Sequence, residues 1–119
     1  MSGKFVIDRA RNGQFYFNLR AANGEPILKS ETYVTRASAE HGIASVKANA
    51  LIDDRYERKT DKSGAPYFNL KAGNHEVIGV SEAYSSAAAR DAGIESLKQN
   101  APDAVTQDNT KAAPTSDSR

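Results

Sequence analysis

A gapless internal repeat constrains the fold of this chain more than any other feature of its sequence. When the sequence is shifted by 51 residues, residues 5–50 align with 56–101, and 19 of the 46 aligned pairs are identical. The triplets Phe17-Asn18-Leu19 and Phe68-Asn69-Leu70 are among them. Agreement this dense indicates a duplication, and one copy is a supersecondary unit too small to bury a good core alone. The repetition is therefore primarily structural.

The first half of each copy has the pattern of β-strands. In the first copy, residues 4–8 and 14–20 alternate apolar and polar side chains, as half-buried strands do. The Asn-Gly pairs at 12–13 and 23–24 predict tight turns, because both residue types tolerate positive φ. Residues 26–31 supply a third strand after the second turn. Three strands in antiparallel succession are therefore expected in each copy.

The second half of each copy has a helical period. Thr35 is a candidate N-cap, and Ala39, Ile43, Val46 and Ala50 recur at spacings of four, three and four. The second copy repeats this pattern with Ser86 as the cap. Its corresponding stripe comprises Arg90, Ile94, Leu97 and Ala101. The charged Arg90 can extend its head group to water while its stem covers apolar surface.

A glycine interrupts each predicted helix at the same place. Gly42 and Gly93 are equivalent in the two copies, and each costs about 1 kcal/mol relative to alanine in a helix interior. A cost that occurs in both copies predicts that another group packs too close to these helices for a Cβ.

The two copies predict one α+β domain. Each reads β-β-β-α, and we expect their sheets to pair in one antiparallel sheet with both helices on one face. Residues 51–59 are predicted to leave the first helix as a strand and to open the second copy. We place a single domain at 1–107, with repeat 1 at 3–54 and repeat 2 at 55–107. Residues 108–119, which have no periodicity and few large apolar groups, are predicted to be a disordered tail.

The composition excludes several classes of protein. There are 16 Lys and Arg against 15 Asp and Glu, so the net charge of +1 gives no overall attraction to nucleic acid or anionic membranes. No cysteine is present, which excludes disulfides, thiolate nucleophiles and zinc fingers. No apolar run approaches the ~20 residues of a membrane span or forms a signal peptide. We therefore expect a cytoplasmic protein without membrane association.

The sequence resembles the YegP-like family of small bacterial tandem-repeat proteins, whose biochemical function is unassigned. The resemblance rests on FYFNLRAANGEPILKSETY at 15–33 and YERKTDKSGAPYFNLKAGNHEVIG at 56–79, and on the helical segments 37–50 and 93–101. Even the replacement of Asn-Gly by Asn74-His75 occurs in that family. The resemblance implies two β-β-β-α-β units with exchanged terminal strands and a pseudo-two-fold axis. Residues 103–107 would then be the exchanged strand that corresponds to the one beginning at Leu51.

The resemblance also bears on assembly and chemistry. Some relatives carry one repeat and pair as dimers, so it implies that this chain is a monomer that acts as a fused dimer. It supplies no catalytic or ligand-binding residue, no cofactor and no metal site.

Catalytic constellations are absent from the sequence. His41 and His75 occupy non-equivalent positions, so a shared metal site or a duplicated general base is not indicated. Glu31 and Glu82 occur in both copies, but a carboxylate between strand and helix commonly bonds nearby backbone or basic groups. A paired acid site would need the two carboxyl groups within about 5–10 Å. No phosphate-binding loop or nucleophile motif is present. We therefore expect no enzyme activity, no metal and no cofactor.

The most distinctive candidate site is the sheet face that the helices leave open. Strand periodicity places two matching sets of side chains there: Tyr16, Asn18 and Arg20 from the first copy, and Tyr67, Asn69 and Lys71 from the second. Tyrosine, amide and cation together suit single-stranded nucleic acid, and Tyr and Arg also anchor protein interfaces. An antiparallel sheet also commonly leaves one face in water without any further role.

These observations lead to a functional expectation. We expect a non-enzymatic binding or interaction module that works through its open sheet face. An unknown protein partner is favoured over nucleic acid because the net charge is only +1. A weak, sequence-tolerant binder of single-stranded nucleic acid is the alternative.

Overall fold

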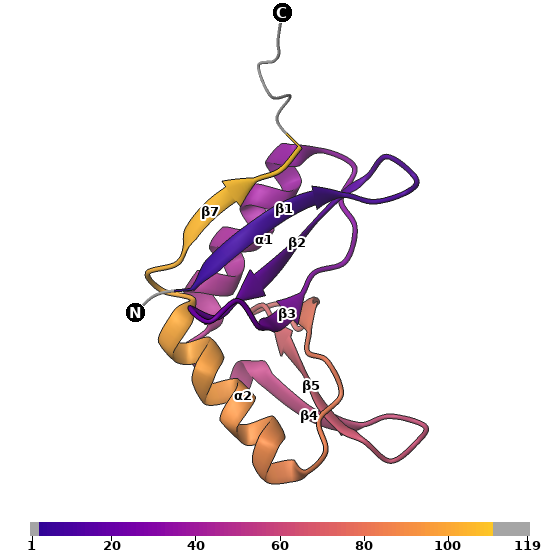
Figure 1. The fold of residues 1–119 in the computed structure, drawn as a ribbon, viewed down its shortest axis with the longest axis vertical. Coiled ribbons are helices and arrows are strands. Elements are labelled where there is room, and N and C mark those ends of the chain that lie inside the picture. The colour runs from indigo at the N-terminus through magenta and orange to yellow at the C-terminus, as the bar shows by residue number, and fades with distance from the viewer. Residues whose placement is uncertain (1–2, 111–119) are drawn as a thin grey trace, which may run out of the picture.

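The computed structural model describes residues 3–110 and shows an α+β fold with one seven-stranded sheet and two helices (Figure 1). Both repeats have the same order of elements. Repeat 1 contains β1 (Lys4–Arg9), β2 (Phe15–Arg20), β3 (Pro26–Lys29) and α1 (Arg36–Asn49). Repeat 2 contains β4 (Tyr56–Thr60), β5 (Pro66–Lys71), β6 (Val77–Val80), α2 (Ala87–Asn100) and β7 (Val105–Asp108). The predicted β-β-β-α arrangement of each copy is confirmed.

The strands are ordered β4-β5-β6-β3-β2-β1-β7 across the sheet. All neighbours are antiparallel except β1 and β7, which are parallel. The prediction of a wholly antiparallel sheet is thus corrected at one edge. The two repeats meet at the centre, where Lys29 of β3 is opposite Val80 of β6. These residues are equivalent by the 51-residue offset, so the pseudo-two-fold axis passes between them.

The strand exchange occurs at one edge only. β7 follows α2 of repeat 2 but lies beside β1 of repeat 1, with Lys4 opposite Val105 and Ile7 opposite Asp108. The strand predicted over residues 51–59 begins later than expected: the chain turns at Leu51, makes a single 3₁₀ turn at Asp53–Arg55 and enters β4 only at Tyr56. The segment after α1 leads directly into β4 and therefore cannot lie beside it.

The first three residues of the predicted tail, 108–110, are ordered parts of the described structure. Asp108 is the last residue of β7, and its buried carboxylate pairs with Arg36 Nε of α1 at 2.8 Å. The Asn109 amide donates to the Ile7 carbonyl at 2.9 Å, and the Thr110 amide donates to Asp108 Oδ1 at 2.8 Å. Residues 108–110 thus belong to the fold. The remainder of the predicted tail, 111–119, lies outside the described residues.

Both helices begin at the predicted caps. The Thr35 hydroxyl accepts from the Ser38 amide, and the Ser86 hydroxyl accepts from the Ala89 amide, each at 3.0 Å. Both helices pack on the same face of the sheet, and each contacts strands of both repeats: α1 contacts β2, β5 and β6, and α2 contacts β3 and β5. The two repeats therefore pack against each other through both helices as well as through the sheet.

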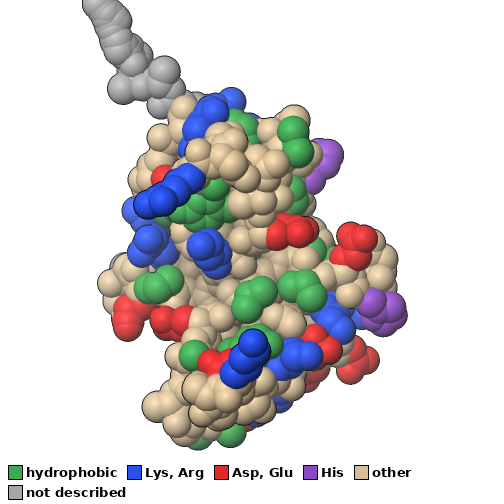
Figure 2. Space-filling model, turned by 90° about the vertical axis from the view of Figure 1, so that its right-hand side faces the viewer, with side chains coloured by type: hydrophobic (Ala, Val, Ile, Leu, Met, Phe, Trp, Pro, Cys, Tyr) green, Lys and Arg blue, Asp and Glu red, His purple; other side chains and the backbone are tan. Residues whose placement is uncertain are grey.

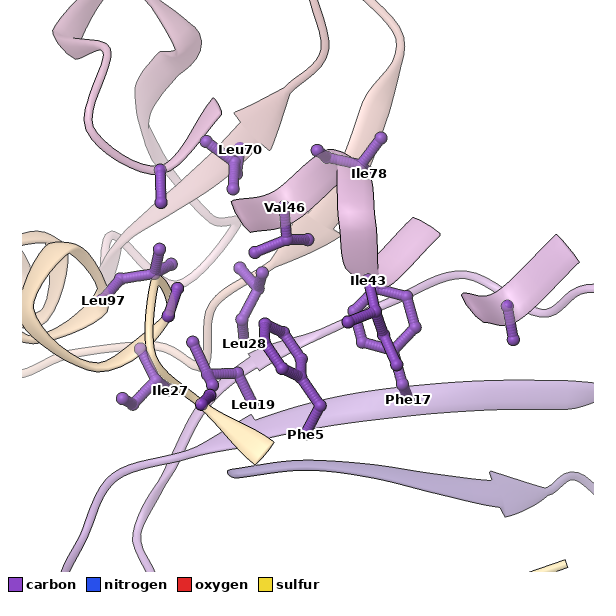
Figure 3. Close-up of a cluster of buried hydrophobic side chains, with 14 of the residues drawn as sticks. Phe5, Phe17, Leu19, Ile27, Leu28, Ile43, Val46, Leu70, Ile78 and Leu97 are labelled. Carbon is purple, nitrogen blue, oxygen red and sulfur yellow. The ribbon is translucent and has the colours of Figure 1, made fainter. Parts of the chain in front are cut away.

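One core extends through both repeats. Figure 3 shows apolar side chains from strands of both repeats and from both helices converging, with Leu28 near the middle of the cluster. The helical stripes predicted from spacing are buried apart from Arg90. Val6 departs from the predicted alternation: only 5% of it is exposed although it lies on the open face. β7 explains this burial, because Gln107 is opposite Val6 and accepts a hydrogen bond from Lys4 Nζ at 3.1 Å.

The close approach predicted at the helical glycines is confirmed. A Cβ on Gly42 would lie 2.5 Å from Tyr33 Oη and 2.9 Å from Phe17 Cε2, and the Tyr84 ring lies equally close to Gly93. Each tyrosine stacks on the phenylalanine in the second strand of its own repeat. The ring centroids of Tyr33 and Phe17, for example, are 6.2 Å apart. The missing side chains make room for these rings between helix and sheet.

Candidate functional site on the open sheet face

All six predicted residues of the open face lie where strand periodicity places them. Their inward neighbours Phe17, Leu19, Phe68 and Leu70 are fully buried, whereas the six are half-buried. The six are Tyr16, Asn18, Arg20, Tyr67, Asn69 and Lys71. All six side chains therefore lie on the sheet face that is turned away from the helices.

The two sets do not form one continuous platform. β3 and β6 lie between β2 and β5, so the sets are about 14 Å apart, which is three strand spacings. The strand pairings trace one row of open-face residues across the whole sheet. In order, this row comprises Gln107, Val6, Asn18, Lys29, Val80, Asn69 and Glu57. Its centre is the Lys29–Val80 pair at the junction of the repeats.

The set on β5 is held by a carboxylate that sequence reasoning missed. Glu57 of β4 accepts from Asn69 Nδ2 at 3.1 Å and pairs with Lys71 Nζ at 3.2 Å. These bonds, first the one from Asn69 and then the one from Lys71, lower the pKa of Glu57. Glu57 takes the place of Val6 in the first copy, and this exchange of valine for glutamate was the available sequence signal. The charge of Lys71 is thus balanced within the protein.

The set on β2 has different partners. Lys29 Nζ lies 5.1 Å from the centre of the Tyr16 ring, which is within the range of cation–π attraction. Arg20 donates to the carbonyl of Gly24 at 3.1 Å and so braces the turn after its own strand. The two cations of this set thus contact an aromatic ring and a backbone carbonyl, whereas Lys71 of repeat 2 contacts a carboxylate.

A pocket lies at the junction of β3 and β6, and we call it the seam pocket. Its volume is about 460 Å³, and it is lined mainly by apolar groups, including Pro26, Leu28, Val77 and Val80. The two strands share a single paired position, Lys29–Val80, so the sheet is hollowed where they diverge. Val80 is 40% exposed, which is unusual for a valine in a central strand. Asn18, one of the six predicted open-face residues, also contributes to its wall.

The two repeated glutamates lie at opposite ends of the seam. Glu31 and Glu82 both line the seam pocket, and both are exposed. Glu31 follows the last residue of β3 by two positions, and Glu82 follows the last residue of β6 by two positions; because the strands are antiparallel, the two glutamates lie beyond opposite ends of the Lys29–Val80 pair. The predicted backbone bonds are made instead by the preceding serines: Ser30 Oγ accepts from the Phe17 amide at 2.9 Å and donates to the Glu31 carbonyl at 2.7 Å.

The histidines lie apart from this pocket. His41 is exposed on α1, and His75 occupies the turn before β6 with φ of 73°, as the turn prediction required. Within residues 3–110, no group of three His, Asp or Glu side chains is placed to hold a metal ion. No helix in the same range is long and apolar enough to cross a membrane.

Charge is mixed over the surface. Figure 2 shows several Lys and Arg side chains gathered over the upper part of the face in view, and Asp and Glu side chains mainly across its middle and lower parts. Exposed hydrophobic side chains lie near the middle of the molecule. The presence of both signs of charge agrees with the net charge of +1.

Comparison with known families identifies the repeat. The family described as "Domain of unknown function (DUF1508)" matches residues 10–57 and again residues 61–108. The two matches start 51 residues apart (61 minus 10), which is the offset of the internal repeat.

Relatives match over nearly their full lengths. UPF0339 protein ACIAD0721 of Acinetobacter baylyi is 54% identical over 92% of this chain and 99% of its own. UPF0339 protein YegP of Escherichia coli K12 is 48% identical over 92% of this chain and 100% of its own. The NMR structure of E. coli yegP, titled a protein of unknown function, superposes with a TM-score of 0.88 at 47% identity, covering 94% of this chain and 97% of that one. The resemblance to YegP-like proteins is therefore confirmed, and the chain belongs to the DUF1508 family, with two tandem copies of its domain.

Proposed function

We propose that this protein is a non-enzymatic binding module of the cytoplasm, and that the seam pocket is its working surface. The observation that supports this most is a pocket of about 460 Å³ with a mainly apolar wall at the centre of an otherwise polar sheet face. Pockets of roughly 300–1,000 Å³ with apolar walls and a few polar groups are typical of small-molecule sites. The site belongs to both repeats, so one copy alone would not form it.

The polar groups of the seam pocket suggest what it would hold. Glu31 and Glu82 provide a negative charge at each end, and Lys29 provides one positive charge at the centre. The exposed Val77 and Val80 offer an apolar surface between them. A ligand with an apolar body and a cationic group would therefore be favoured over an anionic one of similar size.

The positions of the carboxylates favour binding over catalysis. Acid–base catalysis by two carboxylates depends on both reaching one scissile group. Glu31 and Glu82 instead face the seam from its two ends. We infer that they select and orient a bound molecule.

A single-stranded nucleic acid remains the second candidate, with a narrower footprint than the sequence predicted. Tyr16, Lys29 and Arg20 provide an aromatic ring and two cations on repeat 1. Lys71 contributes less, because Glu57 balances its charge. Such a strand would contact repeat 1 alone and would lose affinity steeply with salt.

The experiment compares ligand classes on ¹⁵N-labelled protein. We would titrate small aromatic amines, matched aromatic carboxylates and a short mixed-sequence oligonucleotide, and record amide shifts at two salt concentrations. The proposal expects shifts at β3 and β6 with the amines. Salt-sensitive shifts confined to β2 with the oligonucleotide would favour the second candidate, and an absence of shifts with every probe would reject both.

A matched pair of variants tests the location. Val80→Lys introduces the lysine that repeat 1 carries at the equivalent position. Its side chain would obstruct the pocket, and its charge would repel an amine. Val105→Lys changes a valine that is 67% exposed and lies outside the pocket. Loss of amine binding in the first variant but not in the second is expected. Equal affinity in both would place the site elsewhere.

A further inference from the structure

The two outer edges of the sheet differ in whether an additional strand lies beside the first strand of the repeat. At one edge, β7 pairs with β1 in parallel over four residues. At the other edge, β4 is the last strand of the described sheet, although it is the repeat 2 equivalent of β1. Arg58, Lys59 and Thr60 of β4 are exposed. The position beside β4 that corresponds to β7 is therefore unfilled within residues 3–110.

The length of the repeat explains why the chain cannot fill this position itself. Residues 105–108 form β7, and the equivalent residues of repeat 1 are 54–57. Tyr56 and Glu57 are already the first residues of β4, and Asp54 and Arg55 form the 3₁₀ turn before it. One segment cannot be both β4 and the strand beside β4. A tandem repeat with this offset leaves one such edge open.

We propose that the outer edge of β4 is a docking site for an extended segment of another polypeptide, which adds to the sheet as a parallel strand. Addition of a strand to an exposed sheet edge is a common mode of peptide recognition, in which the backbone supplies affinity and alternate side chains supply specificity. β7 on β1 is the internal template for this complex. It shows both the direction of the added strand and the register that the fold accepts.

The template also specifies the chemistry of the partner. β7 places Gln107 beside Val6 on the open face and Asp108 beside Ile7 on the helix face. At the β4 edge, the equivalent neighbours are Glu57 and Arg58. A hydrogen-bond donor at the third position of the added strand would face Glu57, and a carboxylate at the fourth position would face Arg58.

Arg58 is available for such a carboxylate. Its Nε lies 3.1 Å from Asp91 Oδ1, and both side chains are about half exposed, at 46% and 51%. A guanidinium has five N–H donors, so Arg58 can bind a second carboxylate beside Asp91. On the filled edge, Asp108 similarly meets an arginine, Arg36 of α1. The partner is thus an extended segment with a donor followed by an acidic residue.

The charge of β4 also limits what can bind. Charged side chains on an edge strand discourage indiscriminate pairing with apolar strands. β4 reads Tyr-Glu-Arg-Lys-Thr, and its central residues carry both signs. The β4 edge can therefore pair with a strand of complementary charge, whereas pairing with an apolar or basic strand would be unfavourable.

The first test uses the β7 sequence itself as the probe. A synthetic peptide of residues 103–110 would be added to the ¹⁵N-labelled full chain, and amide shifts and hydrogen exchange would be followed. The expected result is slower exchange and shifts at Tyr56–Thr60. Shifts at Lys4–Arg9 would mean that the peptide only displaces β7 from its own place, and that outcome, like an absence of shifts, would overturn the proposal.

Variants separate strand addition from general attraction. The same peptide with Asn in place of Asp108 is expected to bind about tenfold more weakly, as is the wild-type peptide to the Arg58→Gln protein. Lys62→Gln, in the turn after β4, serves as the control and should leave the affinity unchanged. A peptide with N-methylated backbone and unchanged side chains should not bind. Equal binding of that peptide would exclude strand pairing.

Discussion

Leu28 and Gly79 occupy equivalent positions in the two repeats, and a Cβ on Gly79 would lie 2.5 Å from Leu28 Cδ2. The pseudo-two-fold axis brings each position of this pair against its own counterpart. Two leucines would collide there, and two glycines would leave a void. The fused chain resolves this conflict with one residue of each kind. Lys29 and Val80, the next pair along the same strands, are likewise different residues at equivalent positions.

This relationship predicts strong coupling between positions 28 and 79. Leu28→Gly removes a side chain that is only 2% exposed and should destabilise the fold by about 3–5 kcal/mol. Gly79→Leu should cost about 1–3 kcal/mol or more through overpacking. The double exchange places the leucine on the other side of the axis and should recover most of the loss. Urea unfolding of the four proteins measures the coupling free energy.

An additive result would contradict this account of the seam. If the double variant lost as much stability as the two single variants together, repeat 2 could not house a leucine at position 79. Ile27→Val, which trims a nearby buried side chain without changing the pair, provides a reference for ordinary core loss, at about 0.5–1.5 kcal/mol.

At Gly93, we predict that alanine destabilises the protein although alanine has the higher helix propensity. Alanine would favour the helix by about 1 kcal/mol, but its Cβ would meet the Tyr84 ring. We expect Gly93→Ala to destabilise the protein by about 1–3 kcal/mol. Tyr84→Phe removes the hydroxyl closest to that Cβ, so the double variant should recover part of the loss in thermal unfolding. Greater stability of Gly93→Ala than of wild type would show that the ring is not tightly held.

The duplication made most of the fold predictable. Strand periodicity placed Phe17 and Leu19 inward and Tyr16 outward, and turn chemistry placed His75 at positive φ. These are local properties that neighbouring residues determine. The errors occurred where the repeats cease to be equivalent. Residues 51–55 could not form the expected strand because they connect α1 directly to β4, the first strand of repeat 2.

The candidate site was only partly predictable. The six open-face residues follow from strand alternation, but the seam pocket depends on how β3 and β6 diverge after their single paired position. That geometry is a tertiary property of two segments about fifty residues apart. Glu57 was missed for the same reason, because its bonds to Asn69 and Lys71 require the register of β4 on β5.

The Arg36–Asp108 ion pair should hold β7 on the sheet. Asp108 is buried, with 8% of its side chain exposed, and Arg36 also donates to the Thr110 hydroxyl at 3.0 Å. We expect Asp108→Ala to cost about 1.5–3 kcal/mol and to speed amide exchange selectively in β7 and β1. Asp91→Ala, which removes an exposed carboxylate paired with Arg58 and Arg90, should cost less than about 1 kcal/mol. Equal costs for the two variants would show that burial does not strengthen the Arg36 pair.

Alkaline unfolding should depend on Tyr56. Burial, followed by the nearby Glu95 and Asp53 carboxylates, raises the pKa of this phenol well above its ordinary value of 10.0, and its hydroxyl donates to the Ala50 carbonyl at 2.6 Å. A raised folded-state pKa stabilises the protein fully below the unfolded-state value, and this stabilisation is lost as the pH rises above about 10. The free energy of unfolding should therefore fall with a slope of up to about 1.4 kcal/mol per pH unit for this group.

Tyr56→Phe separates this phenol from the other groups that titrate in the same range. Burial also raises the pKa of Tyr33 and Tyr84, and the hydrogen bond to Asp53 raises the pKa of Lys98, so all three destabilise the fold in the same direction at high pH. The variant should lose about 1 kcal/mol at neutral pH through the missing hydrogen bond. Above pH ~10 its stability should decline less steeply than that of wild type, by about one proton. Urea unfolding between pH 7 and 11.5 measures both effects, and parallel curves for the two proteins would show that Tyr56 does not ionise on unfolding in this range.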